Sequence, residues 1–146
     1  MNKVIVFDID GTLANVEHRR PFIATRPKNW NAWNAGIPND TPHEEIVFLA
    51  KNFHDQGHTV LLCSGRSDDL AKVTTQQMAD FGVTYQGLYM RETGDHRPDS
   101  IVKVELLNRI RKDYGEPYLW FDDRQQVVDA IRAEGVRVLQ VAPGDF

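Results

Sequence analysis

Short apolar runs alternate along the chain with longer segments whose apolar residues recur at helical spacing. The runs are rich in β-branched residues, which is typical of buried strands. They predict five strands, at residues 3–8, 58–63, 85–90, 118–121 and 136–142. The longer segments predict four helices, at residues 42–56, 67–81, 99–114 and 125–134. Strands that alternate with helices favour a Rossmann-like three-layer α/β fold around one parallel sheet.

The helix at residues 42–56 has the clearest start and stop signals. Thr41 is a suitable cap, Pro42 suits the first turn, and Gly57 ends the apolar pattern. Before this helix, the apolar residues of segment 14–40 have no regular spacing, and the segment is too long for an ordinary strand-to-helix connection. We therefore expect them to form a small cap inserted after the first strand.

Polar side chains follow four of the five predicted strands. They are Asp8 and Asp10, Ser64 and Arg66, Arg91, and Asp122 and Asp123. Because the carboxyl ends of parallel strands share one edge of the sheet, we expect these side chains to converge. Lys103 can join them from the helix at residues 99–114. Asp99 lies four residues before Lys103, where it could orient that lysine or cap the helix.

These residue types predict phosphoryl transfer. Asp8 and Asp10 would share a face of an ideal strand, and two close carboxylates favour a divalent cation, Mg²⁺ above all. One carboxylate can attack phosphorus, and a second can move protons. A Ser64 hydroxyl and a Lys103 ammonium can neutralise phosphoryl oxygens.

The chain resembles the haloacid dehalogenase (HAD) superfamily of phosphohydrolases in four ordered motifs, which are Asp8-Ile9-Asp10-Gly11-Thr12, Ser64, Lys103 and Asp122-Asp123. The resemblance implies that Asp8 is the nucleophile and Asp10 the general acid/base. It implies that Ser64 and Lys103 bind phosphate. It also implies a Mg²⁺ site formed by Asp8, Asp122 and the backbone carbonyl of Asp10, with assistance from Asp123.

Nearly the whole chain is also similar to the phosphatase domain of bacteriophage polynucleotide kinase. The similarity is carried by residues 61–66, 91–103, 121–128 and 140–146. It implies removal of 3′-phosphates from DNA or RNA ends or from nucleotides. It implies substrate contacts by Arg66, Arg91, Asp99 and a basic residue of the insertion, Arg19 or Arg20. No GxxxxGK[ST] loop of a kinase occurs here, so we expect a free-standing phosphatase.

Two other functions stay open at this point. The first is a HAD phosphatase for small molecules such as nucleotides or sugar phosphates. The second is a module that binds nucleic-acid ends without hydrolysis, although a pure binder has no need of Asp10. Basic and aromatic residues of the insertion could hold a strand end. Its two tryptophans, Trp30 and Trp33, are spaced by one helical turn and could equally form the core of the cap.

Composition narrows the class of protein further. A length of 146 residues suits one domain over residues 1–146, and a formal charge of -4 gives no overall basic field. The single cysteine, Cys63, excludes an internal disulfide and lies in an apolar run, so we expect a core residue. No signal peptide or membrane-length apolar stretch occurs, so we expect a cytoplasmic protein without membrane contact. The oligomeric state is not predicted.

Overall fold

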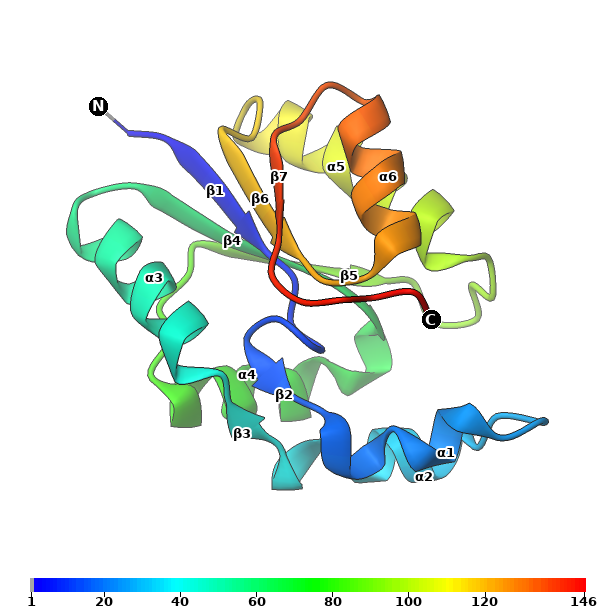
Figure 1. Ribbon diagram of the computed structural model, residues 1–146. Coiled ribbons are helices and arrows are strands. Elements are labelled where there is room, and N and C mark those ends of the chain that lie inside the picture. The colour runs from blue at the N-terminus through cyan, green and yellow to red at the C-terminus, as the bar shows by residue number, and fades with distance from the viewer. Residues whose placement is uncertain (1) are drawn as a thin grey trace.

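A five-stranded parallel sheet forms the centre of the computed structural model, which describes residues 2–146 (Figure 1). The strand order is β5-β4-β1-β6-β7. The strands are β1 (Val4–Phe7), β4 (Thr59–Ser67), β5 (Gly87–Arg91), β6 (Leu119–Asp122) and β7 (Val138–Gln140). All neighbouring strands pair in parallel. The predicted Rossmann-like three-layer α/β fold is therefore confirmed.

Helices cover both faces of this sheet (Figure 1). Helices α3 (Glu44–Asp55) and α4 (Ala71–Phe81) lie on one face, and α5 (Asp99–Asp113) and α6 (Gln125–Ala133) lie on the other. Ile5 and Phe7 of β1 pack into the core on the first side, and Val6 packs on the second. A strand buried on both faces needs apolar residues at every position, and each such side chain stabilises the fold by roughly 1.5–3 kcal/mol.

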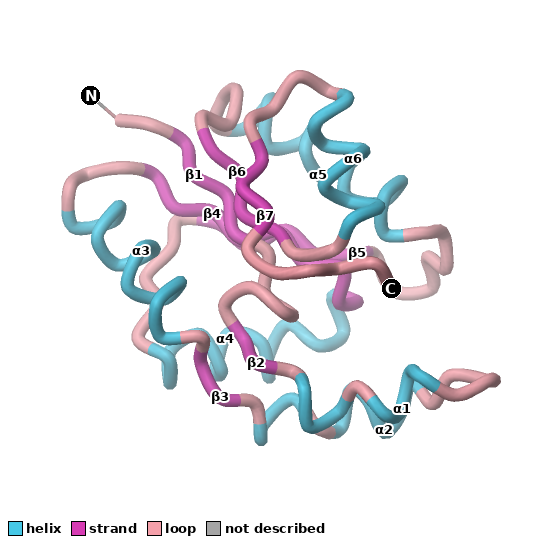
Figure 2. The backbone as a smooth tube through the Cα atoms, in the orientation of Figure 1, coloured by secondary structure: helices cyan, strands magenta, loops and turns pink. Residues whose placement is uncertain are grey.

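Residues 14–40 lie at the bottom of the view in Figure 2, and the end of the segment packs beside α4. They contain η1 (Glu17–Arg19), α1 (Pro21–Ala24), α2 (Trp30–Ala35) and η2 (Ile37–Asn39). Strands β2 (Ala14–Asn15) and β3 (Thr41–Pro42) pair antiparallel at the base of the segment. The helical turn that the Trp30 and Trp33 spacing predicts is present in α2.

The start of α3 differs from the sequence prediction. Pro42 is not in the helix, because it pairs with Ala14 in the short β2–β3 ribbon. Helix α3 begins at Glu44, and its cap residue is His43, which makes no side-chain capping bond. The prediction of a Thr41 cap was therefore wrong. Pairing with a distant segment is a signal that the local pattern does not contain.

Strand β4 is longer than predicted. The expected end was Cys63, but the strand continues to Ser67, and its pairing with β5 is irregular between Ser64 and Ser67. A short η3 turn (Asp68–Leu70) then precedes α4. Cys63 is fully buried, as predicted, and burial raises the pKa of its thiol to about 12. Within residues 2–146, no helix combines the length and apolar character needed to cross a membrane.

Candidate active site

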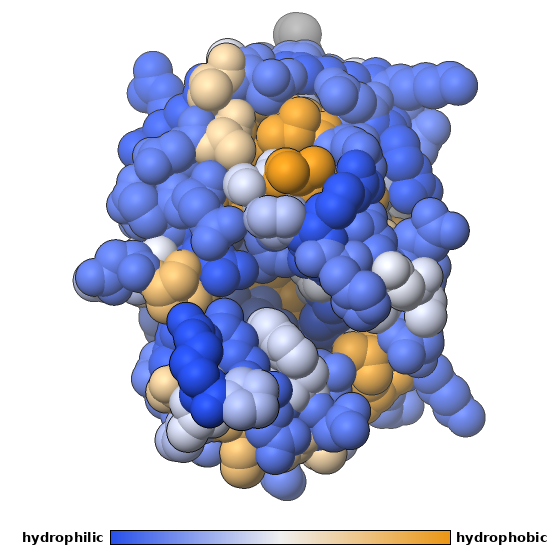
Figure 3. Space-filling model, turned by 90° about the vertical axis from the view of Figure 1, so that its right-hand side faces the viewer, coloured by the Kyte–Doolittle hydropathy of each residue, from blue (hydrophilic) through white to orange (hydrophobic). Residues whose placement is uncertain are grey.

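The carboxyl ends of β1, β4 and β6 open into one cleft of about 800 Å³. Asp8 follows β1, Asp122 ends β6, and Lys103 reaches the same point from α5. Figure 3 shows the surface hollowed at this position, between the upper and lower parts of the molecule. The three side chains line one cleft, so the predicted convergence of Asp8, Lys103 and Asp122 is confirmed. This is the edge at which open parallel sheets bind their ligands.

Lys103 lies between two carboxylates at the bottom of the cleft. Its Nζ donates to Asp8 Oδ1 at 2.6 Å and to Asp122 Oδ2 at 2.8 Å. Thr12 Oγ1 donates to the other oxygen of Asp8 at 2.9 Å, so both oxygens of Asp8 are held in place. Burial first, and then the Asp122 charge, raise the pKa of Asp8 well above its ordinary value.

The same neighbours decide the charge of Lys103. Burial disfavours the ammonium, but Asp122 and Asp8 outweigh burial and raise the pKa of Lys103. Lys103 is therefore a cation, although its side chain is only 3% exposed. It supplies a positive charge inside a cluster that would otherwise hold only carboxylates.

Three carboxylates form a candidate metal site beside Lys103. Asp8, Asp122 and Asp123 each place one oxygen within 4.8 Å of the others. Asp123 Oδ2 is buried and accepts no hydrogen bond within the described chain. Burial first, and then Asp122, raise the pKa of Asp123 to about 6. A divalent cation would satisfy this carboxylate oxygen and offset the repulsion, so the residues fit a hard metal ion.

Gly11 makes room for this arrangement. Its φ of +83° is unfavourable for residues with a side chain, and a Cβ there would lie 2.0 Å from Asp123 Oδ2. The glycine of the first motif therefore permits both the turn after Asp10 and the close approach of the Asp123 carboxylate of the fourth motif.

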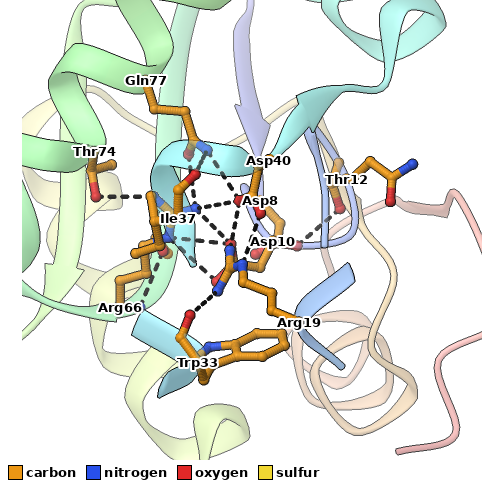
Figure 4. A network of polar contacts seen from close by, with 12 residues as sticks. Asp8, Asp10, Thr12, Arg19, Trp33, Ile37, Asp40, Arg66, Thr74 and Gln77 are labelled. Carbon is orange, nitrogen blue, oxygen red and sulfur yellow. Dashed lines mark hydrogen bonds and ion pairs between the residues drawn. The ribbon is translucent and has the colours of Figure 1, made fainter. Parts of the chain in front are cut away.

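Asp10 has different hydrogen-bond partners from Asp8, although the two carboxylates lie in the same region (Figure 4). Arg66 Nη2 donates to Asp10 Oδ1 at 2.6 Å, and Arg19 Nη2 donates to the same oxygen at 2.8 Å. Burial raises the pKa of Asp10, but Arg66 and Arg19 outweigh burial and lower it to about 2. Strand β1 ends at Phe7, so the two-residue alternation that predicted a shared face does not extend to Asp10.

Asp40 contacts both of these arginines from the opposite side. It accepts hydrogen bonds from Arg19 Nε at 2.8 Å, Arg19 Nη2 at 2.7 Å and Gln77 Nε2 at 3.0 Å. Arg66 Nη2 lies 3.6 Å from Asp40 Oδ2, and Arg66 also donates to Thr74 and Gln77 of α4. The 14–40 segment is thus joined to β4 and α4 by buried charges.

The predicted phosphate and substrate residues occupy different depths. Ser64 is almost fully buried, and its Oγ accepts the backbone N–H of Arg66 at 3.1 Å. Arg19 has no exposed side-chain surface, so in this conformation it contacts Asp10 and not the cleft. Arg20 lines the cleft, with its Nη2 at 3.9 Å from Asp123 Oδ2.

Arg91 and Asp99 organise the loop that precedes α5. Arg91 donates to Asp99 and to the carbonyl oxygens of Gly65, Asp95 and Arg97. Asp99 also accepts from Arg124 Nη1 at 2.7 Å. It is the first residue of α5, not its cap, and it makes no hydrogen bond to Lys103. The prediction that Asp99 orients Lys103 or caps α5 was therefore wrong, although Asp99 lines the cleft.

Four residues around the site were not found by sequence reasoning, namely Asp40, Thr74, Gln77 and Arg124. Thr74 and Gln77 are buried on α4 beside Met78. A threonine and a glutamine at positions of an apolar helix stripe are a signal of a buried polar contact. Asp40 and Arg124 carry no comparable signal, because their partners lie far away in the sequence.

The fold and the site define a phosphatase of the HAD superfamily. Residues 2–146 match the family of the polynucleotide kinase PNKP phosphatase domain, and the chain belongs to that family. The family resemblance seen in the sequence is thereby confirmed.

Similar solved structures agree with this assignment. The structure of a Pnkp1/Rnl/Hen1 complex matches with 31% identity and a TM-score of 0.84, covering 100% of this chain and 47% of the other. A structure of the Pnkp1/Rnl/Hen1 RNA repair complex has 31% identity and a TM-score of 0.83, with coverages of 100% and 44%. The chain thus spans just under half the length of these relatives. A class C acid phosphatase from Bacillus anthracis, with tungstate bound, shares the fold at 15% identity and a TM-score of 0.71, with coverages of 99% and 68%.

Proposed function

We propose that this protein is a Mg²⁺-dependent phosphomonoesterase that removes 3′-phosphates from nucleic-acid ends through an aspartyl-phosphate on Asp8. The observation that carries the proposal is the Asp8–Lys103–Asp122 cluster at the bottom of an open cleft, beside the unsatisfied oxygen of Asp123. A purely structural cluster would not leave a buried carboxylate oxygen without a hydrogen-bond donor. Membership of the PNKP phosphatase family supports the choice of a nucleic-acid 3′-phosphate.

In the first step, an Asp8 oxygen attacks phosphorus and the bond from phosphorus to the 3′ oxygen breaks. The electron pair of that bond stays on the 3′ oxygen, which takes a proton from Asp10. Lys103 holds Asp8 in place and offsets negative charge on the phosphoryl oxygens. Ser64 lies two residues before Arg66 on β4, and its hydroxyl is the further donor that we assign to phosphate.

In the second step, Asp10 accepts a proton from water and the resulting hydroxide attacks phosphorus. The bond between phosphorus and Asp8 breaks, which releases phosphate, restores the Asp8 carboxylate and leaves Asp10 protonated, ready for the next acid step. The low pKa of Asp10, about 2, keeps the carboxyl ionised, so it is able to accept this proton. For the acid step Asp10 must carry a proton, and the negative charge of a bound phosphate raises its pKa by opposing Arg19 and Arg66.

Mg²⁺ is the cation that we assign to the carboxylate cluster. Asp8, Asp122 and Asp123 would hold it, together with the backbone carbonyl of Asp10 that the family resemblance implies. When bound, Mg²⁺ supplies charge neutralisation to phosphoryl oxygens and to the Asp8 carboxylate. Lys103 and the metal would then share the charge of the cluster.

The test is phosphate release from one oligonucleotide carrying its phosphate at either the 3′ end or the 5′ end, with and without Mg²⁺. We expect Mg²⁺-dependent release from the 3′ form only, and loss of release by at least about 10³-fold in Asp8→Asn. A 3′-mononucleotide and a sugar phosphate serve as further substrates. Equal turnover of the sugar phosphate and the oligonucleotide would replace the nucleic-acid assignment with a small-molecule one. Full turnover by Asp8→Asn would refute the covalent mechanism.

A further inference from the structure

Two residues on the connection between α1 and α2, together with the first residue of α2, form one side of the cleft mouth. They are Arg26, Lys28 and Trp30, which we refer to as the cationic rim. All three line the same cleft as Asp8, and the Trp30 side chain is 52% exposed. In Figure 1 this connection projects outward at the right of the view, beyond the body of the molecule.

The charges of the cationic rim have no acidic partner. Arg26 and Lys28 form no ion pair within the described chain, whereas carboxylates pair with the other arginines that line the cleft, which are Arg20, Arg66, Arg91, Arg97 and Arg124. Partial burial, together with the nearby charges of Arg26 and Arg124, lowers the pKa of Lys28. The charge of Asp99 opposes this shift, but the like charges of Arg26, Lys28 and Arg124 still repel each other, and a bound polyanion would relieve that repulsion.

The two tryptophans of α2 have different surroundings. Trp33 is only 9% exposed, and the guanidinium of Arg19 lies 4.2 Å from its ring centre. Asn29 caps the same helix by accepting the N–H of Ala32 at 3.1 Å. Trp33 and the cap therefore fix α2, and the fixed helix presents Trp30 at the cleft. Lys28 Nζ lies 5.3 Å from the Trp30 ring centre, so charge and aromatic surface stand together.

We propose, building on the proposed function, that the cationic rim binds the nucleotides next to the phosphorylated 3′ end of a single strand. Trp30 stacks on a base, and Arg26 and Lys28 contact a backbone phosphate. Stacking accepts any base and either sugar, so both DNA and RNA ends fit. A paired end offers fewer free base faces, so a single-stranded end binds better than a duplex end.

The experiment compares substrates of increasing length, all with a 3′-phosphate: a mononucleotide, a dinucleotide and an octanucleotide, the last as both DNA and RNA. An octanucleotide with abasic sites next to its 3′ end, a blunt duplex and an aryl phosphate complete the set. Trp30→Ala and the double variant Arg26→Ala, Lys28→Ala are tested. Phe48→Ala is the matched control, because Phe48 is a 64% exposed aromatic residue on α3 that does not line the cleft.

We expect kcat/KM to rise from the mononucleotide to the octanucleotide. Trp30→Ala should lower the ratio of kcat/KM on the octanucleotide to kcat/KM on the aryl phosphate by about 5- to 150-fold, since stacking contributes ~1–3 kcal/mol per base. The abasic substrate should reproduce this loss. The double variant should bind the octanucleotide with a weaker salt dependence. The slope of the logarithm of the binding constant against the logarithm of salt concentration should fall in magnitude by about 0.7 for each lost phosphate contact. Phe48→Ala should leave every ratio unchanged.

The proposal is overturned if Trp30→Ala and the double variant keep the octanucleotide-to-aryl phosphate ratio of the unaltered protein. An equal loss of kcat/KM from Trp30→Ala on the abasic and the intact octanucleotide would also overturn it, because stacking would then be absent. Binding of a fluorescent octanucleotide to Asp8→Asn, followed by anisotropy, separates this proposal from the proposed function. If the protein does not hydrolyse the octanucleotide but substitutions in the cationic rim weaken its binding, the proposed function alone is refuted. If the protein hydrolyses the octanucleotide but those substitutions leave binding unchanged, this inference alone is refuted.

Discussion

Asp123 is the residue whose protonation most directly couples the proposed metal site to pH. Its pKa in the metal-free fold is about 6, against an ordinary value of 3.8. The folded state thus favours the proton, so the stabilising contribution is complete below pH 3.8 and is lost as pH rises through 6. A metal ion competes with that proton, because a carboxylate must be ionised to coordinate it.

We therefore predict that Mg²⁺ stabilises the protein more strongly at pH 7.5 than at pH 5. Below pH 6, Mg²⁺ must displace a proton, so its apparent affinity falls by up to about tenfold per pH unit. The measurement is the shift of Tm caused by Mg²⁺ at the two pH values. In Asp123→Asn the shift should be smaller, and its pH dependence weaker. An equal shift at both pH values in the unaltered protein would contradict the assignment of Asp123.

Lys103 provides a second prediction at the scale of one residue. Lys103→Met removes the Nζ that donates to Asp8 Oδ1 at 2.6 Å and to Asp122 Oδ2 at 2.8 Å. Breaking a buried ion pair should lower the free energy of unfolding by about 3–5 kcal/mol without metal. Mg²⁺ should restore part of this loss, because it offsets the same carboxylates, whereas phosphatase activity should stay lost.

Urea unfolding with and without Mg²⁺ measures the loss of stability and its partial recovery. The control is Lys112→Met, an exposed lysine near the other end of α5. If Lys103→Met were as stable as that control, Lys103 would not be the counter-charge of the cluster.

At the scale of the elements, the parallel sheet was predictable because each central strand is apolar on both faces. The site residues at the strand ends, such as Asp8 and Asp122, followed from the same prediction, since parallel strands deliver their carboxyl ends to one edge. The contacts of Arg19 and Arg66 with Asp10 were not predictable. They bring Asp10 and Arg19 together with Arg66, which is distant in the sequence, and no local period reports which charged side chains will meet.

The join between the 14–40 segment and the sheet depends on Asp40. We predict that Asp40→Asn lowers kcat by about 10- to 100-fold, because Arg19 and Arg66 then hold Asp10 less firmly and lower its pKa further. KM on an aryl phosphate should change less than kcat, since Asp40 does not line the cleft. The acidic limb of the pH profile should shift to lower pH.

A merely structural role would not move the pH profile, so that limb is the decisive measurement. Asp69→Asn, an exposed aspartate on η3, is the control. An Asp40→Asn protein with an unchanged kcat and pH profile would show that Asp40 does not position the acid/base group.

At the scale of the whole molecule, the last segment of the chain packs against the candidate metal loop. Val141 N–H donates to the Asp122 carbonyl at 3.0 Å, and Gln140 Nε2 donates to the Asp123 carbonyl at 3.0 Å. Gln125 N–H, at the start of α6, donates to the Gly144 carbonyl at 2.6 Å. The backbone that carries the metal-site carboxylates is thus held between β6, α6 and residues 140–144.

Gly144 makes this packing possible, and its replacement tests whether the packing matters for the metal. A Cβ at Gly144 would lie 1.9 Å from the Asp123 carbonyl oxygen, and that backbone oxygen cannot move away without moving the metal-site loop. We predict that Gly144→Ala weakens Mg²⁺ binding, raising the Mg²⁺ concentration for half-maximal turnover by about tenfold, with a loss of ~1–3 kcal/mol in stability. Asp145→Ala changes the exposed neighbouring side chain and leaves Gly144 in place, so its Mg²⁺ requirement should be unchanged. If both variants showed the Mg²⁺ requirement of the unaltered protein, the carboxylates after β6 would be positioned by β6 alone.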